Sequence, residues 1–454
     1  MKNGLENLGI KVPVIHMPNN EINLGKWAVV ACDQYSSQPE YWREAERIVG
    51  DSPSTLRLVL PEVYLNKPEE AEKSRDINKN MVEYVKNGVL EEQQPGFFLV
   101  DRKTSHAESR KGLVIMLDLE MYDYREGSQS LIRATERTDV NRLPPRIKIR
   151  ENASLELPHI MVLIDDPDKS VIEPLFDIKD RLISMYDFEL MLGGGHIKAY
   201  KIENEAVINE IFSSINKLAD KETFKSKYGV GDDKGALLFA VGDGNHSLAS
   251  AKAHWENIKA VIGDEERLSH PARYALVELV NVHDAGLKFE PIHRVVFNID
   301  LNNFVERMKA FYNGCSKIEL IKYNTKEEMM SEVKKLSKNK TEHYIPIITS
   351  DTHALIEVKS PKCNLEVGTL QAFLDELIKI DTKVKIDYIH GEEVVDSLGA
   401  KNGNIGFYLP VMDKNDLFKT VILDGVLPKK TFSMGEAEEK RFYLECRLIK
   451  DIEL

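Results

Sequence analysis

The chain has 454 residues, of which 42% are hydrophobic and 30% charged, and its formal net charge is −13. This composition excludes a disordered chain, and the length exceeds what a single core usually fills, so we expect more than one packed unit. An acidic chain is also disfavoured as a general nucleic-acid binder, because such binding depends on neutralising phosphates. In chain order, the patterns predict strands at 26–32, 56–60, 97–100, 111–119, 155–164, 235–241, 274–282, 344–349, 354–358, 404–409 and 420–423.

Helices are expected at 40–49, 71–88, 173–185, 204–218, 246–255, 304–312, 326–336, 370–377 and 391–398, and 182–192 also has a helical pattern. The alternation of strands and helices predicts a mixed α/β (α+β) fold. We expect a catalytic phosphate-binding unit at 1–300 and a smaller α/β unit at 301–400. The strands of 401–454 are expected to return to the catalytic unit.

No apolar run reaches the roughly 20 residues that cross a bilayer, and the N-terminus has no basic segment followed by an apolar one. We therefore expect neither a membrane span nor a secretory signal. The four cysteines are far apart and lack metal-type spacing, which indicates reduced thiols in a cytoplasmic protein; they are Cys32, Cys315, Cys363 and Cys446.

The most informative loop follows the predicted strand at 235–241 and reads Gly-Asp-Gly-Asn-His-Ser over 242–247. Glycine lets a backbone approach a ligand, and the first turn of the following helix favours an anion. Asp243 can hold a metal or a proton, and His246 can shuttle a proton. Gly244, Asn245 and Ser247 complete a candidate phosphate loop. The alternative is that Asp243 or Asn245 only caps the helix.

A basic segment over 132–152 supplies a second candidate. Pro144-Pro145 should stop any helix, and the residues after it alternate, which predicts a strand with three cations on one face. The cations of the whole segment form a candidate polyphosphate clamp, since arginine matches phosphate oxygens; they are Arg133, Arg137, Arg142, Arg146, Lys148 and Arg150. Glu136 lies among them and should stay ionised as a proton acceptor. A solvated basic strand is the alternative.

Weaker candidates for substrate or donor binding lie elsewhere, and each on its own is better explained as structural. They are Asp33, Gln34, Tyr35 and Ser36 after the first strand, Gly194 and His196 in a triple-glycine loop, Asn281, His293 and Arg294, and Lys429 and Lys430 near the C-terminus. The sequence contains no Walker loop, Rossmann fingerprint or kinase signature set.

Five segments in order resemble a large prokaryotic family of unknown function that is related to the free serine kinases of the ParB/sulfiredoxin-like fold. VVACDQYSSQPEYW resembles its Pro-Pro-Tyr-Asp turn, TERT at 135–138 its His-Glu-x-Thr segment, and GDGNHSLA its Asp-Gly-His-His-Arg motif. FEPIHRVV resembles Leu-Pro-Tyr-Asn-Arg-Val-Val, and LPKKTFSM resembles the C-terminal Pro-x-Lys-Ser/Thr segment. The resemblance covers nearly the whole chain.

The resemblance implies a ParB/sulfiredoxin-like catalytic unit with additional α/β elements. It also implies a Mg²⁺-dependent kinase that phosphorylates free L-serine with a donor such as pyrophosphate, ADP or ATP. Glu136 matches the family acid, Asp243 and His246 match the motif's Asp and second His, and Thr138 ends the TERT segment. Two departures stand out: Asn245 replaces a His, and Ser247 replaces an Arg.

The two departures leave the choice of donor open. The partners we expect are a small substrate and a phosphoryl donor. A phosphatase or pyrophosphatase using the same residues remains an alternative, as does a ParB-like nucleotide- or nucleic-acid-binding regulator. Neither the oligomeric state nor the direction of the reaction follows from the sequence.

Overall fold

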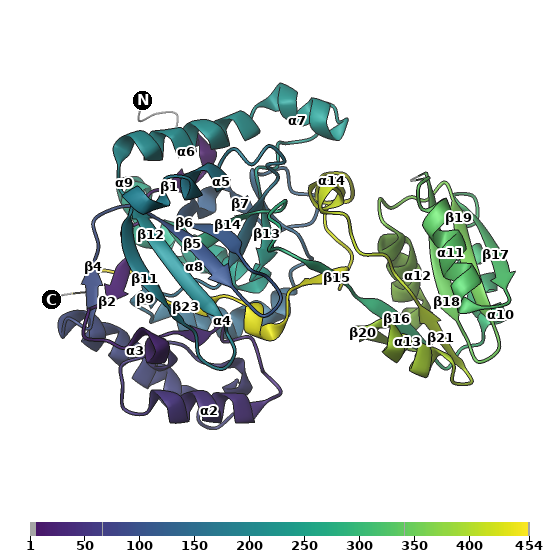
Figure 1. The fold of residues 1–454 in the computed structure, drawn as a ribbon, viewed down its shortest axis with the longest axis horizontal. Coiled ribbons are helices and arrows are strands. Elements are labelled where there is room, and N and C mark those ends of the chain that lie inside the picture. The colour runs from purple at the N-terminus through teal and green to yellow at the C-terminus, as the bar shows by residue number, and fades with distance from the viewer. Residues whose placement is uncertain (1–5, 66, 340, 453–454) are drawn as a thin grey trace. The chain divides into compact units, whose positions relative to one another are not determined.

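The computed structural model describes residues 6–65, 67–339 and 341–452, and these divide into two compact units. The first unit extends to Lys288 and resumes at Gly435, while the second runs from Phe289 to Met434. We expected boundaries near 300 and 400. Instead, residues 401–434 remain with the second unit, because the strand Asn404–Phe407 pairs within that unit's sheet. Figure 1 gives the order of the elements along the chain.

The first unit is built on a large mixed sheet in the order β11-β12-β5-β6-β14-β10-β13-β8-β7, with β1 added beside β6. The strands of this sheet are β1 Ile10–Lys11, β5 Phe97–Lys103, β6 Arg110–Asp118, β7 Tyr122–Asp123, β8 Ile132–Ala134, β10 Met161–Ile164, β11 Ile183–Glu189, β12 His196–Ile202, β13 Phe239–Asp243 and β14 Tyr274–Asn281. Separate two-stranded sheets of the first unit join β2 His16–Pro18 to β4 Leu90–Glu92, β3 Val29–Val30 to β23 Phe442–Tyr443, and β9 Leu155–Glu156 to β24 Arg447–Leu448. The expected mixed α/β fold is confirmed.

Helices cover both faces of this sheet. They are α1 Leu24–Trp27, α2 Pro39–Val49, α3 Glu70–Lys86, α4 Leu143–Glu151, α5 Glu173–Phe176, α6 Glu205–Leu218, α7 Lys221–Tyr228, α8 Asn245–Lys259 and α9 Asp264–Ser269. Successive β5 side chains point to opposite faces. Phe98 therefore packs in the core that contains α2 and α3, and Phe97 packs in the core that contains α6 and α8.

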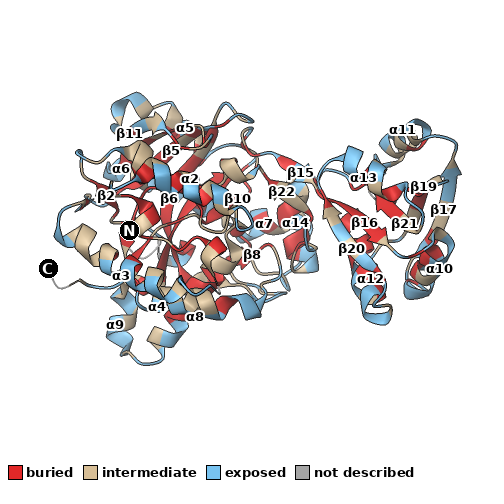
Figure 2. Cartoon of the chain, turned by 90° about the horizontal axis from the view of Figure 1, so that it is seen from below, coloured by how far each residue is buried: buried red, intermediate tan, exposed pale blue. Residues whose placement is uncertain are grey.

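The second unit has a six-stranded sheet in the order β17-β19-β18-β21-β16-β20. Its elements are β15 Phe289–Pro291, β16 His293–Phe297, α10 Leu301–Phe311, β17 Lys317–Tyr323, α11 Lys326–Leu336, β18 Glu342–Ile348, β19 His353–Lys359, α12 Glu366–Ile380, β20 Lys385–Ile389, α13 Glu392–Gly399, β21 Asn404–Phe407, α14 Lys414–Asp424 and β22 Phe432–Met434. In both units the strands are mostly buried and the helices expose their outer sides (Figure 2).

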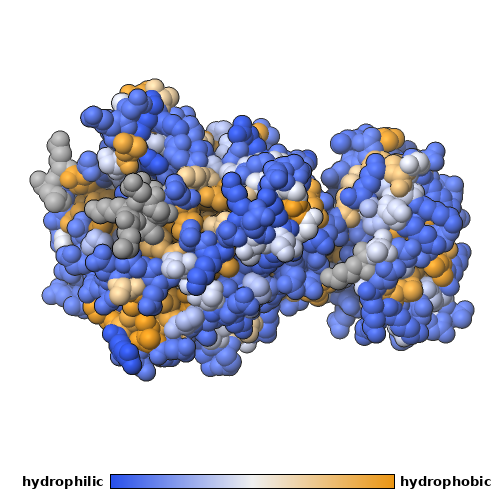
Figure 3. All heavy atoms as spheres, turned by 90° about the horizontal axis from the view of Figure 1, so that it is seen from above, coloured by the Kyte–Doolittle hydropathy of each residue, from blue (hydrophilic) through white to orange (hydrophobic). Residues whose placement is uncertain are grey.

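The surface is mainly hydrophilic on the face drawn in Figure 3, where apolar side chains form separate patches. Within the described ranges, no helix combines the length and apolarity that crossing a bilayer requires.

Several predicted elements differ from those observed. The segment at 146–150 is helical, because Pro144 and Pro145 occupy the first turn of α4, where a backbone N–H has no helical partner anyway. Residues 420–423 belong to helix α14, whose start Asp413 caps by accepting a hydrogen bond from the Asn415 N–H.

Three further stretches were assigned to the wrong type. Residues 182–192 contain strand β11, which pairs with β12, and the expected helix at 173–185 is limited to α5 and a 3₁₀ turn. The expected strand at 56–60 contains the 3₁₀ turn Thr55–Arg57, which Ser54 caps. The strand partner β12 and the capping residue Ser54 lie outside these stretches, so the pattern within each stretch did not indicate its conformation.

Candidate active site

The candidate site begins where β13 ends and α8 starts, as the glycine loop predicted. Gly244 joins them with φ +81°, a conformation that side chains rarely adopt, and a Cβ there would lie 3.1 Å from Ile160. Any other residue would be strained at this φ and would crowd Ile160. Glycine therefore fixes where Asp243 and Ser247 stand relative to each other.

Asp243 forms the central ion pair of the site. One carboxylate oxygen lies 3.1 Å from Lys440 Nζ, and the other accepts the Gly244 N–H at 3.1 Å. Both partners keep some exposure, 27% for the Asp243 side chain and 17% for Lys440. The pair is therefore accessible to a ligand at the positive end of the α8 dipole.

The loop after β8 is held against β13 and α8 by three hydrogen bonds. Thr135 donates its hydroxyl to the Val241 carbonyl at 2.6 Å and its N–H to Asn245 Oδ1 at 3.3 Å. The Asp139 N–H donates to His246 Nε2 at 3.3 Å. Glu136 lies in the chain between Thr135 and Asp139, both of which contact α8. The TERT segment therefore lies beside the glycine loop in the structure.

The surroundings of His246 favour its neutral form. Burial lowers the pKa of its imidazole, and the nearby guanidinium groups of Arg142 and Arg146 lower it further. A neutral ring leaves Nε2 able to accept the Asp139 N–H. His246 therefore positions the loop after β8 in this state.

The cations of α4 are spaced by a helix rather than a strand. Arg146 and Arg150, four residues apart, share one side of α4, while Lys148 lies away from them and is exposed. Arg146 is ion-paired with Glu62, and Arg150 with Glu156. Three cations on one strand face are thus ruled out. Arg142, which lies 3.8 Å from Glu62 and is half exposed, is the least tightly paired of these arginines.

A chain of polar contacts links Ser247 to the loop after β3. Ser247 Oγ lies 3.0 Å from His159 Nε2, and His159 Nδ1 lies 2.9 Å from the Tyr443 hydroxyl. Tyr443 in turn donates to Cys32 Sγ at 3.1 Å. These four side chains come from α8, the segment before β10, β23 and the loop after β3.

Asp33, next to Cys32, is also part of this region. Burial opposes its charge, but His159, a hydrogen bond from Gln34 and the charge of Lys440 together lower the pKa of its carboxyl. Burial, followed by the charge of Asp33, raises the pKa of the Cys32 thiol to about 12. Cys32 is therefore a neutral thiol, and Asp33 is an anion beside His159 and Lys440. Ser36 is exposed, and Tyr35 stacks on Tyr41.

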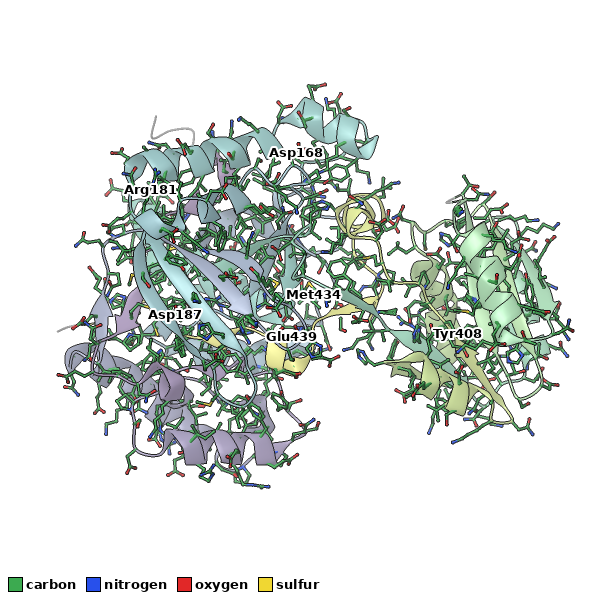
Figure 4. All side chains as sticks on the ribbon, viewed as in Figure 1. Asp168, Arg181, Asp187, Tyr408, Met434 and Glu439 are labelled. Carbon is green, nitrogen blue, oxygen red and sulfur yellow. The ribbon has the colours of Figure 1, made fainter. Side chains whose placement is uncertain are left out.

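Other predicted residues have structural partners elsewhere in the first unit. Arg133 is buried and donates to backbone carbonyls, including that of Ser130 at 2.8 Å, and Arg137 pairs with Glu126. The Gly194 carbonyl accepts hydrogen bonds from Arg102. His196 lies between Glu189 and Asp187, the latter on β11 and labelled in Figure 4.

Asn281 lies at the opposite end of the strands from the candidate site. In the ladder, Met161 is the β10 partner of Asp243, whereas Ile164, three residues further, is the partner of Asn281. Its side chain donates to the Asp166 carbonyl at 2.8 Å and to Glu173 at 2.9 Å. Asn281 is therefore not among the residues that the site brings together.

Four further predicted residues belong to the second unit. His293 is buried there and accepts the Leu409 N–H at 3.0 Å, and Arg294 donates to the Lys429 carbonyl at 2.7 Å while its guanidinium lies over the Tyr388 ring. Lys429 Nζ lies 5.4 Å from the same ring. Lys430 adopts a positive φ of 55° in the loop before β22.

A family model described as "Protein of unknown function (DUF1015)" matches residues 14–377. The chain belongs to this family. The matched stretch contains the loop after β3, the basic segment and the glycine loop, whereas Lys440 and Tyr443 lie beyond its end. A search of curated proteins finds no match.

Solved structures similar to this DUF1015 member share little sequence with it. One is a free serine kinase mutant in complex with ADP, with 11% identity, a TM-score of 0.38, and coverage of 76% of this chain and 94% of that one. Another is a conserved hypothetical protein from Pyrococcus furiosus, with 13% identity, a TM-score of 0.34, and coverage of 73% and 90%. A third is SbnI with a C-terminal truncation from Staphylococcus aureus, with 9% identity, a TM-score of 0.33, and coverage of 71% and 82%.

Four residues of this DUF1015 member's site were not singled out from the sequence: Glu62, His159, Lys440 and Tyr443. The C-terminal motif that the sequence suggests spans 427–434, and Lys440 and Tyr443 lie a few residues beyond it. The sequence signal near them is the run Glu-Lys-Arg-Phe-Tyr at 439–443, in which two cations directly precede two aromatic residues. His159, just after Pro158 and before a buried strand, carries no comparable signal.

The side chains of the site can be compared with the ligands that the expected Mg²⁺ requires. Among the described residues, no group of three or more His, Cys, Asp or Glu side chains is arranged to hold a metal ion. Mg²⁺ commonly binds through one or two carboxylates together with substrate phosphates, so a protein cage is not required. The residues fit a metal that is held by Asp243 and by the phosphates of a donor.

Proposed function

We propose that this protein is a phosphotransferase that moves a phosphoryl group onto the hydroxyl of a small metabolite. The observation that carries the proposal is the accessible Asp243–Lys440 pair at the first turn of α8. A carboxylate and an ammonium group at a helix start suit a transferring phosphoryl group, because phosphoryl transfer depends mainly on positioning and charge neutralisation.

Cations around this pair would hold the donor. Lys440 contacts Asp243 directly, and the charges of Arg142 and Arg146 reach His246 in the first turn of α8. Arg142 is loosely paired and half exposed, so phosphate oxygens can replace Glu62 as its partner. Together with the dipole of α8, these groups favour a polyanion such as pyrophosphate, ADP or ATP.

Two carboxylates are candidates for the base that takes the acceptor's hydroxyl proton. They are Glu136, in the loop after β8, and Asp243. Mg²⁺ held by Asp243 and the donor would neutralise phosphate charge. Free L-serine is the first acceptor to test, because the order of the five motifs resembles the family related to the free serine kinases.

A ³¹P NMR assay tests the proposal. The protein would be incubated with Mg²⁺, with ATP, ADP or pyrophosphate, and with a panel of amino acids and sugars that includes L-serine. We expect a phosphomonoester signal with at least one pair. Release of inorganic phosphate alone would identify a hydrolase instead, and no change with any donor would contradict the proposal.

A matched pair of variants tests the role of Asp243 in the same assay. Asp243→Asn keeps the size of the side chain but removes the charge that pairs with Lys440, so we expect turnover to fall by at least about 10²-fold with little change in stability. Asp168→Asn makes the same substitution at an exposed turn, where Asp168 is labelled in Figure 4, and should leave turnover unchanged. Equal turnover in the two variants would remove Asp243 from the site.

A further inference from the structure

The contacts of Ser247 resemble those of an activated nucleophile. Its hydroxyl lies 3.0 Å from His159 Nε2, within the range over which an imidazole can remove a hydroxyl proton. Ser247 is partly exposed in the first turn of α8, four residues after Asp243. A serine whose only role were helix packing would need no imidazole at this distance.

The partners of Tyr443 fix the orientation and the tautomer of His159. The Tyr443 hydroxyl has a single proton, which it donates to Cys32 Sγ at 3.1 Å. Its oxygen accepts the Cys32 N–H at 3.2 Å, and it lies 2.9 Å from His159 Nδ1. When the tyrosine proton points to Cys32 Sγ, the hydrogen bond between Tyr443 and His159 takes its proton from Nδ1. Nε2 then carries a lone pair that faces Ser247.

An acidic and an aromatic neighbour also lie beside His159. The Asp33 carboxylate is close enough to His159 for their charges to interact. Tyr443 is buried and its ring meets that of His159 edge to face, with 5.4 Å between centroids, which limits rotation of the imidazole. A nucleophile, a base and a group that orients the base are thus all present.

We infer that Ser247 is a nucleophile toward phosphorus, with His159 as its base and Tyr443 as the residue that positions the base. The inference rests on the proposed function for its physiological substrate and names the route of transfer, which is a double displacement through phosphorylated Ser247.

The two half-reactions balance as follows. In the first, Ser247 Oγ bonds to the terminal phosphorus of a phosphoanhydride, the bridging P–O bond breaks with its electron pair on the leaving phosphate, and the serine proton moves to His159 Nε2. In the second, the acceptor hydroxyl attacks the same phosphorus and its proton moves to Glu136 or Asp243. The bond to Oγ breaks, and Oγ regains a proton from His159.

Labelling with diisopropyl fluorophosphate tests the nucleophile without any assumption about the natural donor. Ser247 Oγ would displace fluoride from phosphorus, and peptide mass spectrometry would locate the adduct. We expect labelling at Ser247, slowed about 10²-fold or more in His159→Gln, the loss typical of a missing general base. Ser213, exposed on α6, reports the background, and Ser213→Ala should leave labelling at Ser247 unchanged. No adduct at Ser247, or equal rates with and without His159, would overturn the inference.

Nitrogen NMR tests the role of Tyr443. In protein labelled with ¹⁵N-histidine, His159 should show a protonated Nδ1 and an unprotonated Nε2. Tyr443→Phe should redistribute that proton between the two nitrogens and slow the labelling of Ser247. A loss of packing alone would not move the proton. An unprotonated Nδ1 in the wild-type protein would contradict the relay.

Turnover separates this inference from the proposed function. With pyrophosphate or ATP and no acceptor, one phosphoryl group should appear on Ser247, and Ser247→Ala should show neither the adduct nor turnover. If Ser247→Ala turns over like the wild type, the double displacement is wrong while the phosphotransferase stands. If the wild type transfers nothing to any acceptor, the proposed function fails, and the fluorophosphate result still decides whether Ser247 is a nucleophile.

Discussion

Two neighbouring residues of the C-terminal stretch, Lys440 and Arg441, make ion pairs of contrasting kinds. Lys440 pairs with Asp243 where both side chains remain partly exposed. Arg441 pairs with Glu278 of β14 and with Glu445, and all three side chains are at most 2% exposed. The residues just before them are also anchored, since Glu439, labelled in Figure 4, accepts the Thr104 hydroxyl at 2.8 Å.

The contrast shows why burial distinguishes a charge that holds the fold from one that is available for chemistry. A buried pair cannot exchange its partner for a ligand, and loss of one member leaves an uncompensated charge in a low dielectric. A partly exposed pair loses little when broken, because water replaces the partner. Lys440 can therefore serve a phosphate, whereas Arg441 attaches the C-terminal stretch that carries Lys440 and Tyr443 to the sheet.

Arg441→Ala should have the largest effect on stability. It leaves Glu278 and Glu445 buried without their common partner, so we expect a loss of about 3–5 kcal/mol of unfolding free energy. Lys440→Ala, the matched control, should cost less than about 1 kcal/mol. Urea unfolding followed by tryptophan fluorescence measures both, because Trp27, Trp42 and Trp255 all lie in the first unit. Similar losses in the two variants would contradict the contrast.

Acidification should weaken the first unit through His254 of α8. Burial, the charge of Arg150 and that of His270 lower its pKa from 6.5 to about 4. The unfolded chain then binds the proton more readily than the folded one, so stability is complete above about pH 6.5 and falls as pH decreases toward about 4. The loss should reach about 3 kcal/mol.

The test is the pH dependence of urea unfolding with His254→Gln. This variant should flatten the profile between about pH 6.5 and 4. His106→Gln, at an exposed position of the same unit, should leave the slope unchanged. A wild-type slope in His254→Gln would assign the acid sensitivity to other groups.

The sequence predicts an element of this fold correctly where the residues that determine its conformation lie close together in the chain. The strand, the glycine loop and the helix around 242–247 were predicted because glycine freedom and apolar periodicity act over a few residues. The segment at 146–150 was misread because alternating Arg-Ile-Lys-Ile-Arg fits a strand, while the two prolines that seemed to end a helix instead begin one. The partner that shapes its charge, Glu62, lies 84 residues away from Arg146.

The candidate site could also be predicted only where its residues lie close together in the chain. Asp243, Asn245, His246 and Ser247 could be proposed from one motif, but His159, Lys440 and Tyr443 reach it from elements far apart in the chain. Lys440 and Tyr443 reach the site because the C-terminal stretch returns to the first unit, where β23 pairs with β3. No local sequence pattern predicts a pairing between strands so far apart in the chain. The sequence predicts that the cations of the basic segment act as one clamp. In the structure, Arg137, Arg146 and Arg150 each pair with a different carboxylate.

Arg146→Ala should weaken donor binding by about tenfold, which is the effect of one lost charge-assisted hydrogen bond. Removal of the guanidinium also exposes the phosphates to the Glu62 carboxylate that Arg146 now neutralises. The KM for the donor should therefore rise with little change in kcat. The double variant Arg146→Ala/Glu62→Gln should recover part of the loss, and no rise in KM would exclude Arg146 from the donor site.

Lys148→Ala should have the smallest effect and completes the test of α4. In a strand, Lys148 would stand on the same face as Arg146 and Arg150, and its removal would weaken the donor as much as theirs. In the observed helix it points away from them and is exposed, so the donor KM should change less than about twofold and the unfolding free energy by less than about 0.5 kcal/mol. Donor kinetics of Lys148→Ala beside Arg146→Ala distinguish the two geometries, because both variants remove one cation from the same helix. A tenfold rise in both would mean that total charge, rather than direction, holds the donor.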